Sequence, residues 1–179
     1  MSAIVSDSVM RIADAFVEEL NLEAATTKRV LERVPEAQLA WQPHAKSMSL
    51  GQLALHVATL PGLVTQFLSG DALDFDSVPK EPPTVATHAD LLGAFVASTE
   101  QARAYLVDLN DDRATATWCL VAGERQLLAA PRAAMLRSLL FNHWYHHRGQ
   151  LVVYLRLLDV PVPSVYGPTA DENPFAAVQ

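Results

Sequence analysis

The sequence contains a single cysteine, Cys119, among 179 residues, so no disulfide can form within the chain. A chain of this length buries about two-thirds of its unfolded surface, which is enough for a core without such crosslinks. Residues 1–16 carry Asp7, Arg11 and Asp14 where a signal peptide needs an uninterrupted apolar core. We therefore expect one domain, spanning residues 1–179, and a cytoplasmic location.

Charge is also scarce. Charged residues make up 18% of the chain, against about 25% in an ordinary soluble domain. The 13 basic residues are outnumbered by 20 acidic ones and form no cluster. Because nucleic acids and anionic membranes are bound through Lys and Arg, we exclude both as partners. No charge-free apolar run reaches the ~18 residues needed to span a bilayer. The low charge fits either a homodimer that covers apolar surface or a monomer with a well-filled core and an alanine-rich surface.

Apolar residues recur at three- and four-residue spacing in four stretches, which predicts four helices. These stretches are residues 8–34, 50–69, 87–109 and 131–159. Ser6 or Asp7 can cap the first helix, and Ser49 with Gln52 can form a capping box for the second. We expect Gly70 to end the second helix in a left-handed conformation.

The segments between these helices differ in character. Residues 71–86 are polar and contain three prolines, and their length favours a crossover rather than a tight turn. Residues 110–130 are the least helical, and Gly123 can turn the chain back there. Pro131 suits the first turn of the last helix. The predicted fold is all-α: a four-helix bundle with a long crossover between helices two and three and a small irregular or hairpin insertion before helix four.

Three histidines occupy positions that the apolar pattern reserves for core residues. His56 lies among leucines on the inward side of the second helix, where Pro61 predicts a kink. His143 and His147 are four residues apart on the seam of the last helix, so both rings share one face. A buried imidazole is costly unless its nitrogens are satisfied, and one metal ion shared by facing helices can satisfy all three. We therefore predict that these histidines bind one divalent transition metal.

The other candidates are expected to lie outside this site. His146 is one turn from a predicted ligand but lies off the seam, so we assign it a supporting or surface role. His44 and His88 are near helix starts and are not expected to be ligands. Cys119 has apolar neighbours and is expected to be a small buried hydrophobe rather than a reactive thiol.

The segments that carry these histidines resemble a known family. The motif consists of Ser-Leu-Gly-Gln-Leu-Ala-Leu-His56, then His143-x-x-x-His147-Arg148-Gly149-Gln150-Leu151, then Tyr154-Leu155-Arg156. It is similar to that of the DinB-like superfamily of metal-dependent hydrolases and thiol transferases, and the likeness covers nearly the whole chain. The resemblance implies a four-helix bundle, a homodimer, and a nickel, zinc or similar ion held by His56, His143 and His147.

The resemblance also implies a chemistry, in which the metal activates a low-molecular-weight thiol such as bacillithiol, mycothiol or glutathione. Three neutral imidazoles leave an open coordination position, as in catalytic zinc sites. We expect thiol transfer to a small electrophile. Hydrolysis by metal-bound water, or a non-catalytic metal- or ligand-binding role in a stress response, are the alternatives. Arg148 and Gln150, next to the ligands, are weak candidates for supporting catalytic residues.

Overall fold

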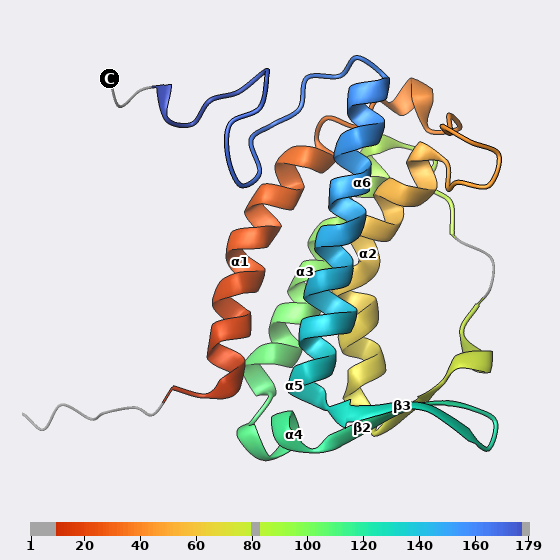
Figure 1. Cartoon of the computed structure of the whole chain (residues 1–179), viewed down its shortest axis with the longest axis vertical. Helices are drawn as coiled ribbons and strands as arrows, with labels where there is room; N and C mark the ends of the chain where they lie inside the picture. The colour runs from red at the N-terminus through yellow and green to blue at the C-terminus, as the bar shows by residue number, and fades with distance from the viewer. Residues whose placement is uncertain (1–9, 80–82, 177–179) are drawn as a thin grey trace, which may run out of the picture.

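The computed structural model describes residues 10–79 and 83–176. Four long helices run side by side (Figure 1): α1 (Ile12–Leu31), α2 (Leu50–Ser69), α3 (His88–Asp108) and α6 (His143–Leu157). Both α1 and α2 pack against α3 and α6. The fold is mostly helical, as predicted, but it is not all-α because a small three-stranded sheet lies at one end of the helices. In the part of the chain that is described, no helix has the length and hydropathy to cross a membrane.

The connection between α2 and α3 is long for a geometric reason. The two helices run in the same direction in Figure 1, so the chain has to return along the molecule before α3 can begin. Strand β1 (Ala72–Asp74) and the short helix η2 (Phe75–Ser77) lie on this connection. A further short helix, η1 (Glu36–Gln38), lies between α1 and α2.

Helix α1 is shorter than the sequence predicts. It begins at Ile12, where the carboxylate of Asp14 accepts a hydrogen bond from the backbone N–H of Arg11 (2.9 Å). This carboxylate satisfies a backbone donor just before the helix begins. Ser6 and Asp7, the caps expected from the sequence, lie outside the described residues. The helix also ends about one turn earlier than expected.

Helix α2 has the predicted bounds, and its start has the predicted cap. The Ser49 hydroxyl accepts a hydrogen bond from the Gln52 backbone N–H (3.2 Å), and the Gln52 side chain accepts one from the Ser49 N–H (2.9 Å). The capping box is therefore confirmed. The expectation for Gly70 was wrong, because this residue is extended (φ −81°) rather than left-handed.

Side chains from other elements satisfy the C-terminal end of α2 instead. The guanidinium of Arg132, which is 1% exposed, donates to the carbonyls of Leu68 (3.1 Å) and Gly70 (2.7 Å) and pairs with Asp71. The hydroxyl of Tyr105 also donates to the Leu68 carbonyl (3.0 Å). The last carbonyls of a helix lack partners within it, so these donors take the place of the expected glycine cap.

The predicted hairpin is present, within a larger sheet. Helix α4 (Asp111–Thr115), which was not predicted, precedes β2 (Thr117–Ala122) and β3 (Arg125–Pro131). Gly123 turns the chain between these strands at φ +56°, a conformation that costs glycine little. The sequence predicts a loop where β1 lies. This prediction was wrong, because β1 pairs in parallel with β2.

The last helical segment changes its winding along its length. Helix α5 (Arg132–Met135) is followed by a π-helical turn, η3 (Leu136–Asn142), and then by α6. The sequence predicts one regular helix here, with Pro131 in its first turn. Pro131 instead ends β3 and directly precedes α5. π-helical turns inside helices are rare and frequently lie at functional sites.

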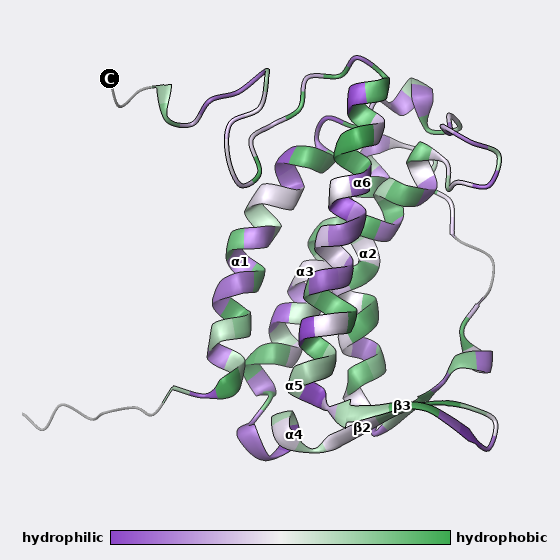
Figure 2. Cartoon of the chain, in the orientation of Figure 1, coloured by the Kyte–Doolittle hydropathy of each residue, from purple (hydrophilic) through white to green (hydrophobic). Residues whose placement is uncertain are grey.

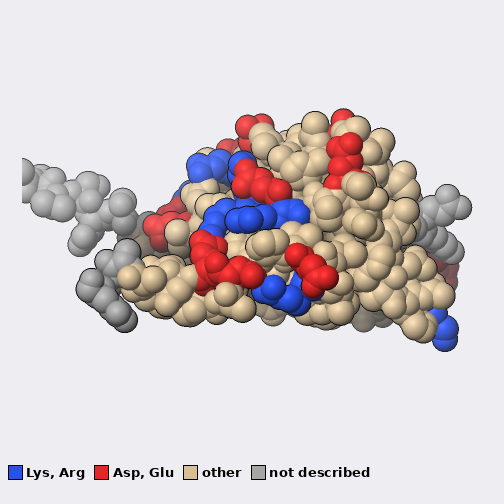
Figure 3. All heavy atoms as spheres, turned by 90° about the horizontal axis from the view of Figure 1, so that it is seen from above, with Lys and Arg blue, Asp and Glu red and all other residues tan. Residues whose placement is uncertain are grey.

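The C-terminal segment is tied to one end of the molecule by ion pairs. Arg29 of α1 pairs with Glu172, and Arg156 of α6 pairs with Asp171. Figure 3 shows this end with acidic and basic side chains side by side rather than in a patch of one sign. Two ion pairs therefore join the C-terminal segment to α1 and α6.

Candidate metal centre

Three histidines come together where α2 faces α6. His56 is carried by α2, and His143 and His147 lie one turn apart on α6. The Nε2 atoms of His56 and His143 are 3.4 Å apart. One nitrogen of each of the three rings lies within 4.8 Å of those of the other two. The structure thus brings together the three residues that the sequence singles out.

The spacing of these nitrogens fits a single small ion. Two nitrogens bonded at 2.0–2.1 Å to a tetrahedral zinc would lie about 3.4 Å apart, which is the separation between His56 and His143. Imidazole is a good ligand for zinc and nickel. Among the residues described, the cluster contains no cysteine or carboxylate, so its three ligands are neutral.

Hydrogen bonds behind two of the rings determine which nitrogen faces the cluster. Nδ1 of His143 donates to the carbonyl of Leu139 (3.2 Å), and Nδ1 of His147 donates to Oε1 of Gln150 (2.8 Å). Each bond places the proton on Nδ1 and leaves Nε2 bare for a metal. The backbone N–H of His143 donates to the carbonyl of Leu140, while the ring of the same residue donates to Leu139.

Gln150 connects a cluster histidine to its exposed neighbour. While its oxygen accepts from His147, its amide nitrogen donates to Nε2 of His146 (3.1 Å). The His146 ring is exposed and lies 5.0 Å from the His147 ring, outside the cluster. Gln150 therefore orients a candidate ligand from behind, and its supporting role in catalysis stays a prediction.

Burial keeps the cluster histidines neutral. Burial first, and then the nearness of His147 and His143, lower the pKa of His56 to about 4. Burial also lowers the pKa of His143 and of His147. Because a metal binds the neutral imidazole, the three side chains are in the ligand form at neutral pH.

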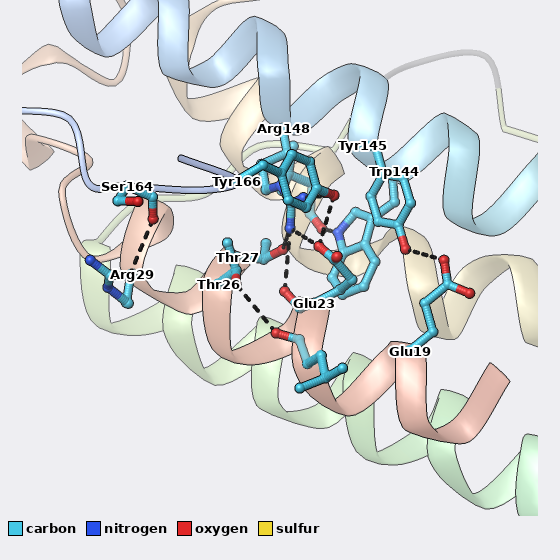
Figure 4. A network of polar contacts seen from close by, with 12 residues as sticks. Glu19, Glu23, Thr26, Thr27, Arg29, Trp144, Tyr145, Arg148, Ser164 and Tyr166 are labelled. Carbon is cyan, nitrogen blue, oxygen red and sulfur yellow. Dashed lines mark hydrogen bonds and ion pairs between the residues drawn. The ribbon is translucent and has the colours of Figure 1, made fainter. Parts of the chain in front are cut away.

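Arg148 points toward α1 and Tyr166, as Figure 4 shows. Its guanidinium, 2% exposed, pairs with Glu23 of α1 (2.6 Å) and donates to the hydroxyl of Thr27 (2.9 Å). The rings of Tyr145 and Tyr166 have their centroids 5.2 and 5.1 Å from it. Arg148 thus joins α6 to α1 and to the C-terminal segment, and it does not touch the cluster.

The remaining candidates lie elsewhere. Cys119 is half-buried on β2, with its sulfur 3.7 Å from the side-chain oxygen of Gln126, so it is less buried than expected. His44 is exposed. The Nε2 atom of His88 hydrogen-bonds the carbonyl of Leu31 (3.0 Å). Neither of these two histidines belongs to the cluster.

An apolar pocket of about 220 Å³ adjoins the cluster, and His56 and His143 form part of its wall. Apart from these two, the wall is apolar, and α2, β1, β2 and η3 all contribute to it. Figure 2 shows hydrophobic residues along α2 and the β2–β3 hairpin. Sequence reasoning missed this pocket because it depends on the pairing of β1 with β2, which no local pattern reveals.

Comparison with known proteins agrees with this architecture. The model of the DinB family matches residues 6–174. A protein of Bacillus subtilis (strain 168), called uncharacterized protein YrdA, is 27% identical over 164 residues, which are 89% of this chain and 90% of that protein.

Solved structures share the fold at low sequence identity. A DinB-like protein from Bacillus cereus has a TM-score of 0.67 and 21% identity, with 86% of this chain and 97% of that chain covered. A DinB-like protein from Bacillus subtilis, YjoA, has a TM-score of 0.65 and 18% identity, with 84% and 96% covered.

Proposed function

Because the chain belongs to the DinB family, we propose that it is a metal-dependent enzyme that transfers a low-molecular-weight thiol to a small electrophile. One divalent ion, nickel or zinc, would be held by His56, His143 and His147. The observation that carries the proposal is the position of these three neutral side chains, which converge beside an apolar pocket. A three-histidine ligand set leaves a coordination position open to a further ligand, as in catalytic zinc sites.

The metal would supply a Lewis acid that favours the thiolate form of a bound thiol, which is the nucleophilic form. The residues of the chain prepare the site for this role. The three imidazoles are neutral, whereas carboxylate ligands would offset part of the positive charge. Leu139 and Gln150 hold the rings of His143 and His147 in orientation. In the transfer, the thiol gives its proton to solvent, its sulfur bonds to the electrophilic carbon, and the leaving group departs with the electron pair.

The sequence leaves two other functions open. A non-catalytic metal-binding protein would be favoured by a fourth protein ligand closing the site. The cluster has three members among the described residues and adjoins a pocket, which supports an enzyme instead. A hydrolase would use the same ligands with water in place of the thiol, and the experiment below separates the two.

Cobalt substitution tests the proposal directly. The cobalt-loaded protein would be titrated with bacillithiol, mycothiol, coenzyme A and glutathione, because a cobalt–thiolate bond has a charge-transfer band in the near ultraviolet. At least one thiol should produce this band. Conjugation of the same thiol to a haloarene should then depend on the metal.

The controls use the histidines themselves. Alanine in place of His56, His143 or His147 should remove both the metal and the band, whereas His146→Ala should keep close to one ion per chain by elemental analysis. No band with any thiol, together with no metal-dependent conjugation, would reject thiol transfer. Metal-dependent ester hydrolysis by the same protein would then support the hydrolase.

A further inference from the structure

Apart from His56 and His143, the pocket beside the histidine cluster is lined by apolar side chains. Leu60, Val64 and Phe67 of α2 line one side, and Trp118 and Leu120 of β2 line another. No charged side chain is among the described residues that line it. Any ligand that enters therefore exchanges water for hydrocarbon over most of its surface.

The polar atoms in this wall are already engaged, with one exception. The indole N–H of Trp118 donates to the carbonyl of Phe67 (3.1 Å), and Nδ1 of His143 donates to Leu139. The exception is the cluster itself, where the Nε2 atoms of His56 and His143 lie 3.4 Å apart. The wall thus offers a ligand apolar contacts, with the rings of His56 and His143 where the pocket adjoins the cluster.

The size of the pocket limits what can occupy it. An engineered apolar cavity of about 150 Å³ stays dry and binds benzene. The pocket here, of about 220 Å³, has room for an aromatic ring with a short substituent. A charged group placed in it would lose its hydration without gaining a partner, and that loss is unfavourable.

We propose that this pocket binds the uncharged, apolar part of the electrophilic substrate, an aryl or short alkyl-aryl group, with the reactive carbon against His56 and His143. The inference rests on the proposed function, because it places the electrophile beside the metal ion and the thiol which that function requires. It adds a substrate class, which neither the histidine cluster nor the family specifies.

The test measures binding of inert probes to the full-length protein after its metal has been removed by chelation. Toluene, ethylbenzene and propylbenzene would be titrated by calorimetry, with the indole N–H resonance of Trp118 reporting their location. Affinity should rise about fourfold for each methylene group until the pocket is full. Phenylacetate and phenethylamine, which carry a charge on a similar frame, should bind at least tenfold more weakly.

Two matched tryptophan variants test whether the probes bind in the pocket. Leu120→Trp fills the pocket and should weaken binding at least tenfold. Leu127→Trp makes the same change on β3 of the same hairpin, outside the pocket wall, and should leave binding unchanged. Leu120→Gln keeps the side-chain volume but makes the wall polar, and it should also weaken binding. This second variant keeps the test valid if the tryptophan variant does not fold. Equal binding of charged and uncharged probes, or an unchanged Leu120→Trp variant, overturns the inference.

The same preparations separate this inference from the proposed function. A cobalt–thiolate band without binding of any apolar probe would leave thiol transfer standing and reject the apolar substrate. Probe binding without metal or band would keep the pocket as a binding site and reject the thiol chemistry.

Discussion

At the scale of single residues, substitution of Gln150 tests whether the hydrogen-bond partner of a candidate ligand affects metal affinity. Its side-chain oxygen accepts a hydrogen bond from Nδ1–H of His147 and so fixes the orientation of that ring. Partners of this kind are typically worth ten- to a hundredfold in metal affinity. Gln150→Ala should therefore weaken metal binding about ten- to a hundredfold, as measured by competition with a chromophoric chelator. Gln150→Glu retains the acceptor and should stay near the wild-type value, and equal affinities for all three proteins would refute the role.

His56 predicts a pH dependence of stability in the metal-free protein. Its pKa is about 4 in the folded chain, against an ordinary value of 6.5. Between these two values the unfolded chain binds more protons, so the free energy of unfolding rises with pH. Stability should be complete above about pH 6.5 and should fall towards pH 4. The loss should be about 1–2 kcal/mol after allowance for the partial exposure of the ring.

Urea unfolding of the chelated protein at several pH values between 7 and 4 measures this dependence. The His56→Gln variant, which cannot titrate, serves as the control and should show a flatter profile. A variant with the same slope as the wild type would mean that other groups carry the acid sensitivity. Added metal should make the wild-type profile steeper, because protons and metal compete for the same nitrogens.

At the scale of elements, the end of α2 depends on a buried arginine. Replacing Arg132 with Met would leave the Gly70 carbonyl without this donor and the Leu68 carbonyl with the Tyr105 hydroxyl alone, which should lower the free energy of unfolding by about 2–4 kcal/mol. Asp71→Asn is the matched comparison. Its side chain is 94% exposed, so loss of that ion pair should cost less than about 1 kcal/mol. Urea denaturation of both variants measures the difference, and equal losses would show that the ion pair, rather than the cap, stabilises this end.

The same elements show which parts of the fold can be predicted from sequence. The bounds of α2 depend on a capping box and a periodic apolar face, both of which involve neighbouring residues. The spacing of His143 and His147 was predicted for the same reason, since both lie after the π-helical turn in regular α-helix. Local spacing does not determine how deeply each leucine of α2 is buried, since Leu63 is 39% exposed.

Features that join distant segments were not predicted. The pairing of β1 with β2 connects residues more than forty positions apart, and the cap on α2 comes from Arg132. Arg148 stands next to a candidate ligand in the sequence, but successive residues of a helix point about 100° apart. Its side chain therefore reaches α1 instead of the histidines. In the candidate site, the sequence predicted that His56, His143 and His147 come together, whereas the pocket required the tertiary structure.

At the scale of the whole molecule, we propose that two copies of the chain associate. The charged fraction is low, and Val153 and Leu157, one turn apart on α6, are both more than half exposed. Stable dimers bury about 1,200–2,000 Å² of surface in total, including apolar residues of this kind. Light scattering at micromolar concentration should give twice the mass of one chain, and the mass of a single chain would contradict the proposal.

The π-helical turn η3 also sets how far α6 is rotated about the helix axis relative to α5. Arg132, before the turn, must meet the end of α2, while His143 and His147, after it, must face the middle of α2. Each residue of an α-helix advances the side-chain direction by about 100°. Removing one residue from the turn would restore regular winding and rotate the histidine-bearing half away from His56 while leaving the other half in place. The extra residue of the turn thus sets a rotation that serves both ends of this helical segment. Arg132 reaches the end of α2, and His143 and His147 face His56 further along.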